Sequence, residues 1–141
     1  MKVVIDTNVL IAGLLKDSIV RQILFFNHVD FYLPDKAIEE LKKHKSDLLE
    51  KSDLSSEEFG FVIDTLLEKM TIVSKEVIKP FMEKSEEIMK GIDVADSAFI
   101  ATALSIGADG IWSFDNHFKE QKEVSIISVE DLMKTLDEVR G

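Results

Sequence analysis

A short run near the start of the chain, KVVI at residues 2–5, is β-branched from Val3 to Ile5 and is followed at once by the acid Asp6 and by Thr7 and Asn8. A run without a polar face is typical of a strand that is covered on both sides, as in a parallel sheet. A carboxylate at the end of such a strand is costly to bury unless it is hydrogen-bonded, paired or bound to a metal. The sequence therefore predicts a buried parallel strand and a group that compensates Asp6.

Strand-like and helix-like segments alternate along the rest of the chain. The expected strands are residues 2–5, 31–33, 71–74, 110–114 and 124–127. The expected helices cover residues 9–15, 19–26, 35 to about 45, 55 to about 70, 80 to about 91, 95–104 and 129 onward. Alternation of this kind indicates an α/β fold with a doubly wound parallel sheet.

Three local expectations follow from the same pattern. Pro80 suits the first turn of a helix, where its missing N–H costs nothing. The polar stretch 44–56 and the helix after it predict a projecting helical pair. Trp112 and the nine phenylalanines are expected in the core, because most of them lie in apolar runs.

Length and charge limit the classes of protein that this chain can represent. With 141 residues, of which 45% are hydrophobic, residues 1–141 are expected to form a single domain. The sequence has no apolar run long enough to span a membrane, so we expect a soluble, cytoplasmic protein. Its net charge of −10 argues against binding nucleic acid mainly by non-specific charge attraction. The absence of cysteine excludes disulfides, thiolate metal ligands and cysteine nucleophiles.

Acidic residues fall where a parallel sheet binds ligands, beyond the carboxyl ends of its strands. Asp6 ends the first expected strand and Asp115 ends the fourth, so the two carboxylates converge if these strands are neighbours. Glu40 and Asp96 can join them from helices. Four carboxylates in one crevice cannot all stay ionised without a cation. Oxygen ligands without thiolate or histidine favour Mg²⁺ or Mn²⁺, either of which can activate water and polarise a phosphoryl oxygen.

The chain resembles the PIN domain family at several places. The matching stretches are VVIDTNVLI at residues 3–11, Glu40 followed by Leu41, DSAFIATAL at 96–104 and SFDNHF at 113–118. The resemblance covers almost the whole chain and implies a three-layer α/β/α sandwich with a five-stranded parallel sheet. It also implies Mg²⁺- or Mn²⁺-dependent cleavage of RNA and frequent homodimers. Many small prokaryotic members resemble the ribonuclease toxins of toxin-antitoxin pairs, which a small antitoxin protein holds in check.

The family motifs assign roles to individual residues. By this resemblance, the catalytic and metal-binding acids are Asp6, Glu40, Asp96 and Asp115, and the supporting polar residues are Thr7, Asn8 and Ser113. Asp93 and Asn116 match the motifs less clearly. Asp93 is three residues before Asp96, a spacing that puts both on one helix face.

Each candidate also has an ordinary structural interpretation. Asp6 can cap a helix, Asp96 can interact with a helix dipole, and Asp115 with Asn116 can form a turn. Helical spacing does not distinguish Glu40 from Glu39, and only the family motif favours Glu40.

The basic stretch LKKHK follows Glu40 on the same expected helix. Such a run is usually a solvated face, but its lysines are the best candidates in the sequence for contacts to an RNA backbone; they are Lys42, Lys43 and Lys45. His117, like His28 and His44, is expected to be a surface or packing residue rather than a ligand.

Three classes of function fit the pattern of acids. The first is a metal-dependent ribonuclease, acting as a toxin or in RNA processing. The second is a phospho-receiver or aspartyl phosphatase, but the phosphatase needs a second aspartate where this chain has Asn8. The third is a binding module that keeps the PIN fold without catalysis.

Overall fold

The computed structural model describes residues 1–15 and 18–141, and its centre is a single all-parallel sheet. The strands lie in the order β3-β2-β1-β4-β5. Their bounds are β1 Lys2–Ile5, β2 Asp30–Pro34, β3 Met70–Val73, β4 Gly110–Trp112 and β5 Ile126–Ile127. The five-stranded parallel sheet is therefore as the sequence predicted.

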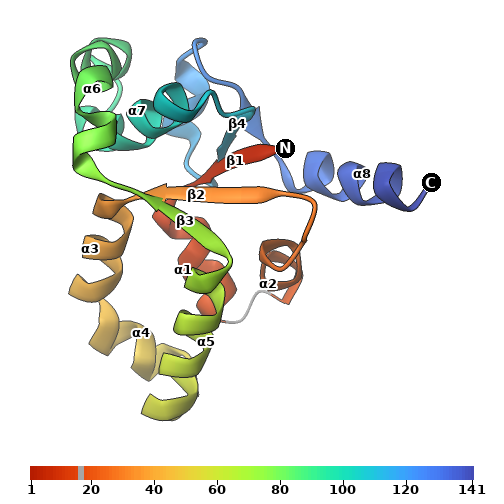
Figure 1. Ribbon diagram of the computed structural model, residues 1–141. Helices are drawn as coiled ribbons and strands as arrows, with labels where there is room; N and C mark the ends of the chain where they lie inside the picture. Colours follow the sequence, from red (N-terminus) through yellow and green to blue (C-terminus); the bar gives the residue numbers. More distant parts are fainter. Residues whose placement is uncertain (16–17) are drawn as a thin grey trace.

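Helices cover both faces of this sheet and complete a three-layer α/β/α fold (Figure 1). One face carries α6 Lys75–Met89 and α7 Ser97–Ile106. The other carries α1 Thr7–Leu15, α2 Ser18–Leu24, α3 Asp35–Lys43, α4 Lys45–Lys51 and α5 Ser56–Glu68. The chain ends in α8 Val129–Arg140, which lies beside α2. Two short 3₁₀ helices are η1 Val94–Asp96 and η2 Asn116–Glu120.

The central position of β1 explains its composition. Val3, Val4 and Ile5 are each 0% exposed, because β1 has a strand on either side and helices on both faces. α7 packs between the sheet and α6, and its small side chains allow this close approach on all sides. The glycine after α7, Gly107, adopts a left-handed backbone (φ 62°) and ends the helix.

The order of the strands reverses between β1 and β4. From β1 the chain moves outward to β2 and β3, and it then returns to the other side of β1 to form β4. Ile5 lies opposite Trp112 in this pair of strands, and the N–H of Asp6 donates to the carbonyl of Trp112 at 3.0 Å. The residues that follow β1 and β4 therefore leave the sheet next to each other, at the place where open parallel sheets bind ligands.

The prediction for Pro80 is wrong, because this residue lies inside α6 rather than in its first turn. The helix begins five residues earlier, after Ser74, whose hydroxyl accepts the N–H of Val77. Ser74 resembled the last residue of a strand in the sequence, and this concealed the true start of the helix. Pro80 is exposed, so the helix carbonyl that it leaves without a donor can bond to water.

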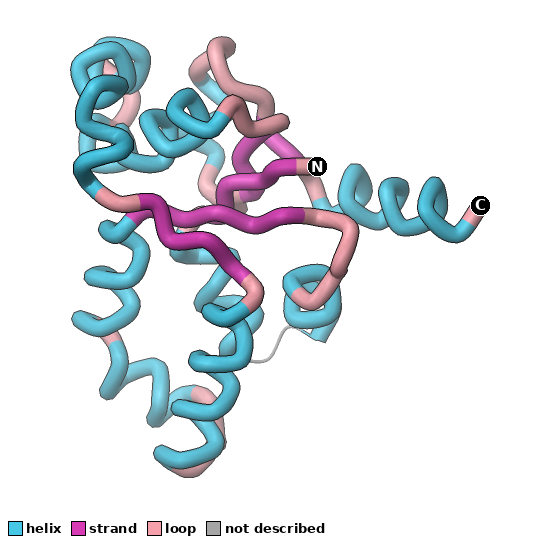
Figure 2. The backbone as a smooth tube through the Cα atoms, viewed as in Figure 1, coloured by secondary structure: helices cyan, strands magenta, loops and turns pink. Residues whose placement is uncertain are grey.

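The projecting part of the molecule contains three helices rather than the predicted pair. Residues 45–51 form the short helix α4, which lies with α3 and α5 in an arm that extends away from the sheet (Figure 2). The sequence concealed α4 because only one of its side chains, Leu48, is buried.

The expectation that the aromatic residues form the core is correct for some of them and wrong for others. Trp112 is 1% exposed and lies in the main core with Phe31, Phe59, Phe99 and Phe118. Phe61 and Phe114 are 72% and 48% exposed. Phe114 lies beyond the end of β4, which is shorter than predicted and stops at Trp112.

None of the helices within residues 1–15 and 18–141 has the length and the apolar composition that a membrane span requires.

Candidate metal centre

Asp6 is a nearly buried acid, 7% exposed, between the end of β1 and the start of α1. Its Oδ1 accepts the backbone N–H of Thr7, and its Oδ2 accepts the hydroxyl of Ser113, each at 2.7 Å. Burial raises the pKa of Asp6 above its ordinary value of 3.8, and these two hydrogen bonds oppose that shift. The charges of Glu40 and Asp115 raise the pKa of Asp6 further, so both carboxylates act on the same site.

Ser113 connects two acids at the switch point of the sheet. Its hydroxyl donates to Asp6, and its Oγ accepts the backbone N–H of Asp115 at 2.9 Å. A longer bond, 3.5 Å, joins the N–H of Phe114 to Oδ1 of Asn8. The loop after β4 is thus tied to the start of α1, and this holds Asp115 near Asp6.

His117 lies between two carboxylates at the rim of the site. Its Nδ1 is 3.3 Å from Oδ1 of Asp115 and 3.4 Å from Oδ2 of Asp93. Asp115 caps η2 by accepting the N–H of His117 at 2.9 Å, and Asp93 caps η1 by accepting the N–H of Ala95 at 3.1 Å. Asp115 therefore also performs the turn role that the sequence allowed for it, and Asp93 also caps a helix.

Asp96 ends η1 and precedes α7, with its side chain partly buried. Desolvation, the largest cause, and the charge of Asp93 raise the pKa of Asp96 from 3.8 to about 6. The charges of Asp6 and Asp115 add to the shift, and that of Lys36 opposes it. The pKa of Asp96 is therefore raised by the charge of Asp93, just before η1, and by the charges of Asp6 and Asp115, which follow β1 and β4.

The structure distinguishes Glu40 from its neighbour Glu39 on α3. Glu40 is partly buried, and its charge acts on Asp6. Glu39 is exposed and accepts a hydrogen bond from Nζ of Lys75 on α6 at 2.6 Å. Nζ of Lys36 is 4.0 Å from Oε1 of Glu40 and donates to the carbonyl of Ala95. Lys36 is thus a cation next to the acids.

The side chains at this place fit a divalent cation. One ligand atom from each of Asp93, Asp96 and His117 lies within 4.8 Å of the other two. Oγ1 of Thr7, beside Asp6, is buried and has no hydrogen-bond partner within the described residues. Asp6 and Asp96 have pKa values that are raised by burial and by neighbouring carboxylates, and a cation relieves such an arrangement. Asp93, Asp96, His117 and the carboxylates around Asp6 are the residues that would hold it.

The structure gathers most of the predicted site residues and leaves a few outside. Those gathered by hydrogen bonds or electrostatic interaction are Asp6, Thr7, Asn8, Glu40, Asp93, Asp96, Ser113 and Asp115. Asn116 is exposed at the start of η2. Lys42 and Lys45 line a groove beside Ile63 and Leu67 of α5, and Lys43 is exposed.

Two residues at the site were not among the sequence candidates. His117 was expected at the surface or in packing, and it is 49% exposed, but its ring also faces Asp93 and Asp115. Its position two residues after a strand-end acid is a signal that could have identified it. Lys36 precedes Glu40 by four residues, a helical spacing that places the two side chains on one face.

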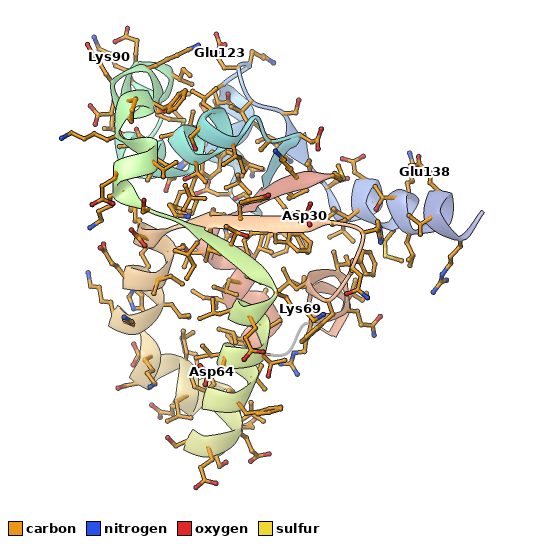
Figure 3. The ribbon with its side chains drawn as sticks, in the orientation of Figure 1. Asp30, Asp64, Lys69, Lys90, Glu123 and Glu138 are labelled. Atoms are coloured by element: carbon orange, nitrogen blue, oxygen red, sulfur yellow. The ribbon has the colours of Figure 1, made fainter. Side chains whose placement is uncertain are left out.

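Charged residues elsewhere lie on other parts of the molecule. Asp30 and Lys69 lie at the amino ends of β2 and β3, opposite the candidate metal centre, and Asp64 lies on the helical arm (Figure 3). Glu123 and Glu138 lie near the C-terminal part of the chain (Figure 3). The negative charge of the chain is therefore spread over its surface as well as gathered at the site.

Comparison with known proteins adds one finding. A family model described as a PIN domain matches residues 4–137, which include every acid of the site. A search of the curated proteins gives no match.

Proposed function

The chain belongs to the PIN domain family, and from this premise we propose that it is a metal-dependent ribonuclease that hydrolyses phosphodiester bonds in single-stranded RNA. In this proposal residues 1–141 form one nuclease domain. The observation that carries the proposal is the pair Asp6 and Ser113, which joins the ends of β1 and β4 and has Asp115, Glu40 and Asp96 around it.

Mg²⁺ or Mn²⁺ is the proposed cofactor, because the donors at the site are carboxylates apart from His117 and the chain has no thiolate. Such a cation would supply an activated water and positive charge for the phosphodiester. It would also offset the repulsion between RNA and a chain of net charge −10.

The protein's own side chains have distinct parts in this proposal. Ser113 and the N–H of Thr7 hold the carboxylate of Asp6 in one orientation. Hydrogen bonds of this kind to a metal ligand set its direction and its charge. Lys36, beside Glu40, is placed to approach a phosphate that enters the site.

The test is cleavage of labelled single-stranded RNA by the wild type and by Asp6→Asn, each with Mg²⁺, with Mn²⁺ and with EDTA. We expect cleavage only by the wild type and only with a divalent cation. A second measurement, the affinity for the cation by calorimetry, should fall in Asp6→Asn. Equal cleavage by both proteins would contradict the role of Asp6, and no cleavage by either would favour a binding module.

The family resemblance also supports proposals about partners. We propose that the protein forms a homodimer and that a small antitoxin protein inhibits it. Light scattering of the purified protein tests the dimer. A neighbouring gene for a small DNA-binding protein would support the toxin role, and its absence would favour a role in RNA processing.

A further inference from the structure

A cavity of ≈ 430 Å³ lies between α3, α6 and α7. We call it the α3–α6 pocket; its floor is Ile78, Met82 and Ala98, and its rim is Asp35, Lys36, Glu39, Lys75 and Lys79. The floor belongs to a small apolar cluster that is separate from the main core and includes Val73 and Ala101. An apolar floor with a few charged groups at the rim and a volume of this size are typical of a site for a small organic group.

The rim has three lysines and two acids in a chain with ten more acidic than basic residues. Lys75 engages both acids, because its Nζ donates to Glu39 and its backbone N–H donates to Asp35 at 3.1 Å. Within the described part of the chain, Lys79 has no hydrogen bond or ion pair with another side chain. Lys79 is therefore a cation without an acidic partner in the described part of the chain, and Lys36 has its acidic neighbour, Glu40 at 4.0 Å, outside the rim.

Lys36 is shared by the α3–α6 pocket and the candidate metal centre. Its Nζ donates to the carbonyl of Ala95, the residue before Asp96, and is 4.0 Å from Glu40. Ala98, in the floor of the pocket, lies in the first turn of α7, two residues after Asp96. A ligand in the pocket would thus lie next to the acids that are proposed to cleave RNA.

We propose that the α3–α6 pocket receives the nucleobase of a nucleotide next to the bond that is cleaved, an inference that rests on the proposed function. The base lies against Ile78, Met82 and Ala98, and Lys36 and Lys79 contact the adjoining phosphates. A base attached to a phosphate matches an apolar floor beside cations, and the continuity with the acids favours RNA over an acidic peptide.

The direct test is an NMR titration of the full chain in Mg²⁺ with each of the four nucleoside 5′-monophosphates, which contain no phosphodiester to cleave. We expect the methyl resonances of Met82 and Ala98 to shift and saturate with at least one nucleotide, and ribose 5-phosphate to leave them in place. If none of the four nucleotides moves these methyls, the proposal is wrong. If only an acidic peptide moves them, the pocket is a protein-docking site and the proposal is also wrong.

Lys79→Gln tests the phosphate contact, with Lys84→Gln as its control on the outer part of the same helix. We expect Lys79→Gln to raise KM for single-stranded RNA several-fold with kcat retained. The slope of log affinity against log salt should fall by about 0.7, the value for one phosphate contact on a single strand. Lys84→Gln should change neither quantity, and equal behaviour of the two variants would contradict the proposal.

The outcomes separate this inference from the proposed function. If RNA is cleaved but Lys79→Gln and the Met82 methyl are unaffected, the pocket proposal fails and the ribonuclease proposal stands. If nucleotides move the Met82 and Ala98 methyls but the wild type cleaves no RNA with Mg²⁺ or Mn²⁺, the ribonuclease proposal fails. The pocket then remains a nucleotide site of another function.

Discussion

Ser113 donates its hydroxyl proton to Asp6 with an Oγ–Oδ2 distance of 2.7 Å, although 107 positions separate the two residues in the sequence. The bond crosses from the end of β4 to the end of β1, and both side chains are buried. It therefore orients a carboxylate that water scarcely reaches, and several consequences can be measured.

Ser113→Ala removes the donor to Asp6 and the acceptor for the N–H of Asp115. We expect the affinity for Mg²⁺ or Mn²⁺ to fall by about 10- to 100-fold, as it does when a partner of a metal ligand is lost. The free energy of unfolding should fall by about 1–2 kcal/mol, because the buried carboxylate of Asp6 and the partly buried N–H of Asp115 each lose a partner. Calorimetry and chemical denaturation measure the two effects. Ser113→Thr keeps the hydroxyl and should keep most of the metal affinity; a loss as large as that in Ser113→Ala would contradict this role.

The pKa of about 6 at Asp96 predicts a pH dependence of stability in the metal-free protein. The folded state binds this proton more tightly than the unfolded state, so the resulting stabilisation is full below about pH 4. It is lost as the pH rises through about 6. Asp96→Asn removes the titration, so the variant should gain stability relative to the wild type between pH 4.5 and 7.5. Thermal unfolding in EDTA measures this difference.

The capping carboxylates Glu58 and Asp131 act in the opposite direction, since hydrogen bonds at their helix starts lower their pKa values. Their contribution is lost as the pH falls, and it is common to the wild type and to Asp96→Asn. The comparison of the two proteins therefore isolates Asp96. A constant difference in melting temperature across this pH range would contradict the assignment.

Lys36→Met should change metal binding and RNA binding in opposite directions. The lysine opposes the negative field at Asp96, so its removal should tighten Mg²⁺ or Mn²⁺ binding by about 3- to 10-fold. The same change should weaken RNA binding, because a cation beside the site is lost. Lys42→Met, in the groove beside α5, should leave metal affinity unchanged. If Lys36→Met binds the cation more weakly than the wild type, Lys36 does not act as a competing charge.

Gly110→Ala should destabilise the pairing of β4 with β5. A Cβ at residue 110 would lie 2.6 Å from the carbonyl oxygen of Ser125 and 2.8 Å from Cγ1 of Ile127. We expect a loss of about 1–3 kcal/mol in the free energy of unfolding, measured by denaturation in urea. Gly60→Ala is the matched control. Its Cβ meets nothing within 4 Å in α5, so it should stabilise the helix by about 0.5–1 kcal/mol.

Particular residues show why some predictions from sequence succeeded. The β-branched run before Asp6 and the small, apolar residues of α7 both lack a polar face, and burial on all sides imposes that local pattern directly. The failures occurred where local chemistry is ambiguous. Pro80 suits a first turn by its local chemistry but lies in the interior of α6, and α4 buries only Leu48, so its apolar pattern is too weak to identify a helix.

By itself the sequence determined the fold class, the order of the helices and strands apart from α4, and the placement of Asp6 at the end of a buried strand, because each depends on the pattern of apolar residues along a short segment. Only the tertiary structure decided that Ser113 bonds to Asp6, that His117 faces Asp93, and that Lys36 stands between the acids and the α3–α6 pocket. These contacts depend on which strand lies beside β1 and on how η1 and η2 leave the sheet. They join segments far apart in the chain, and no local pattern encodes them.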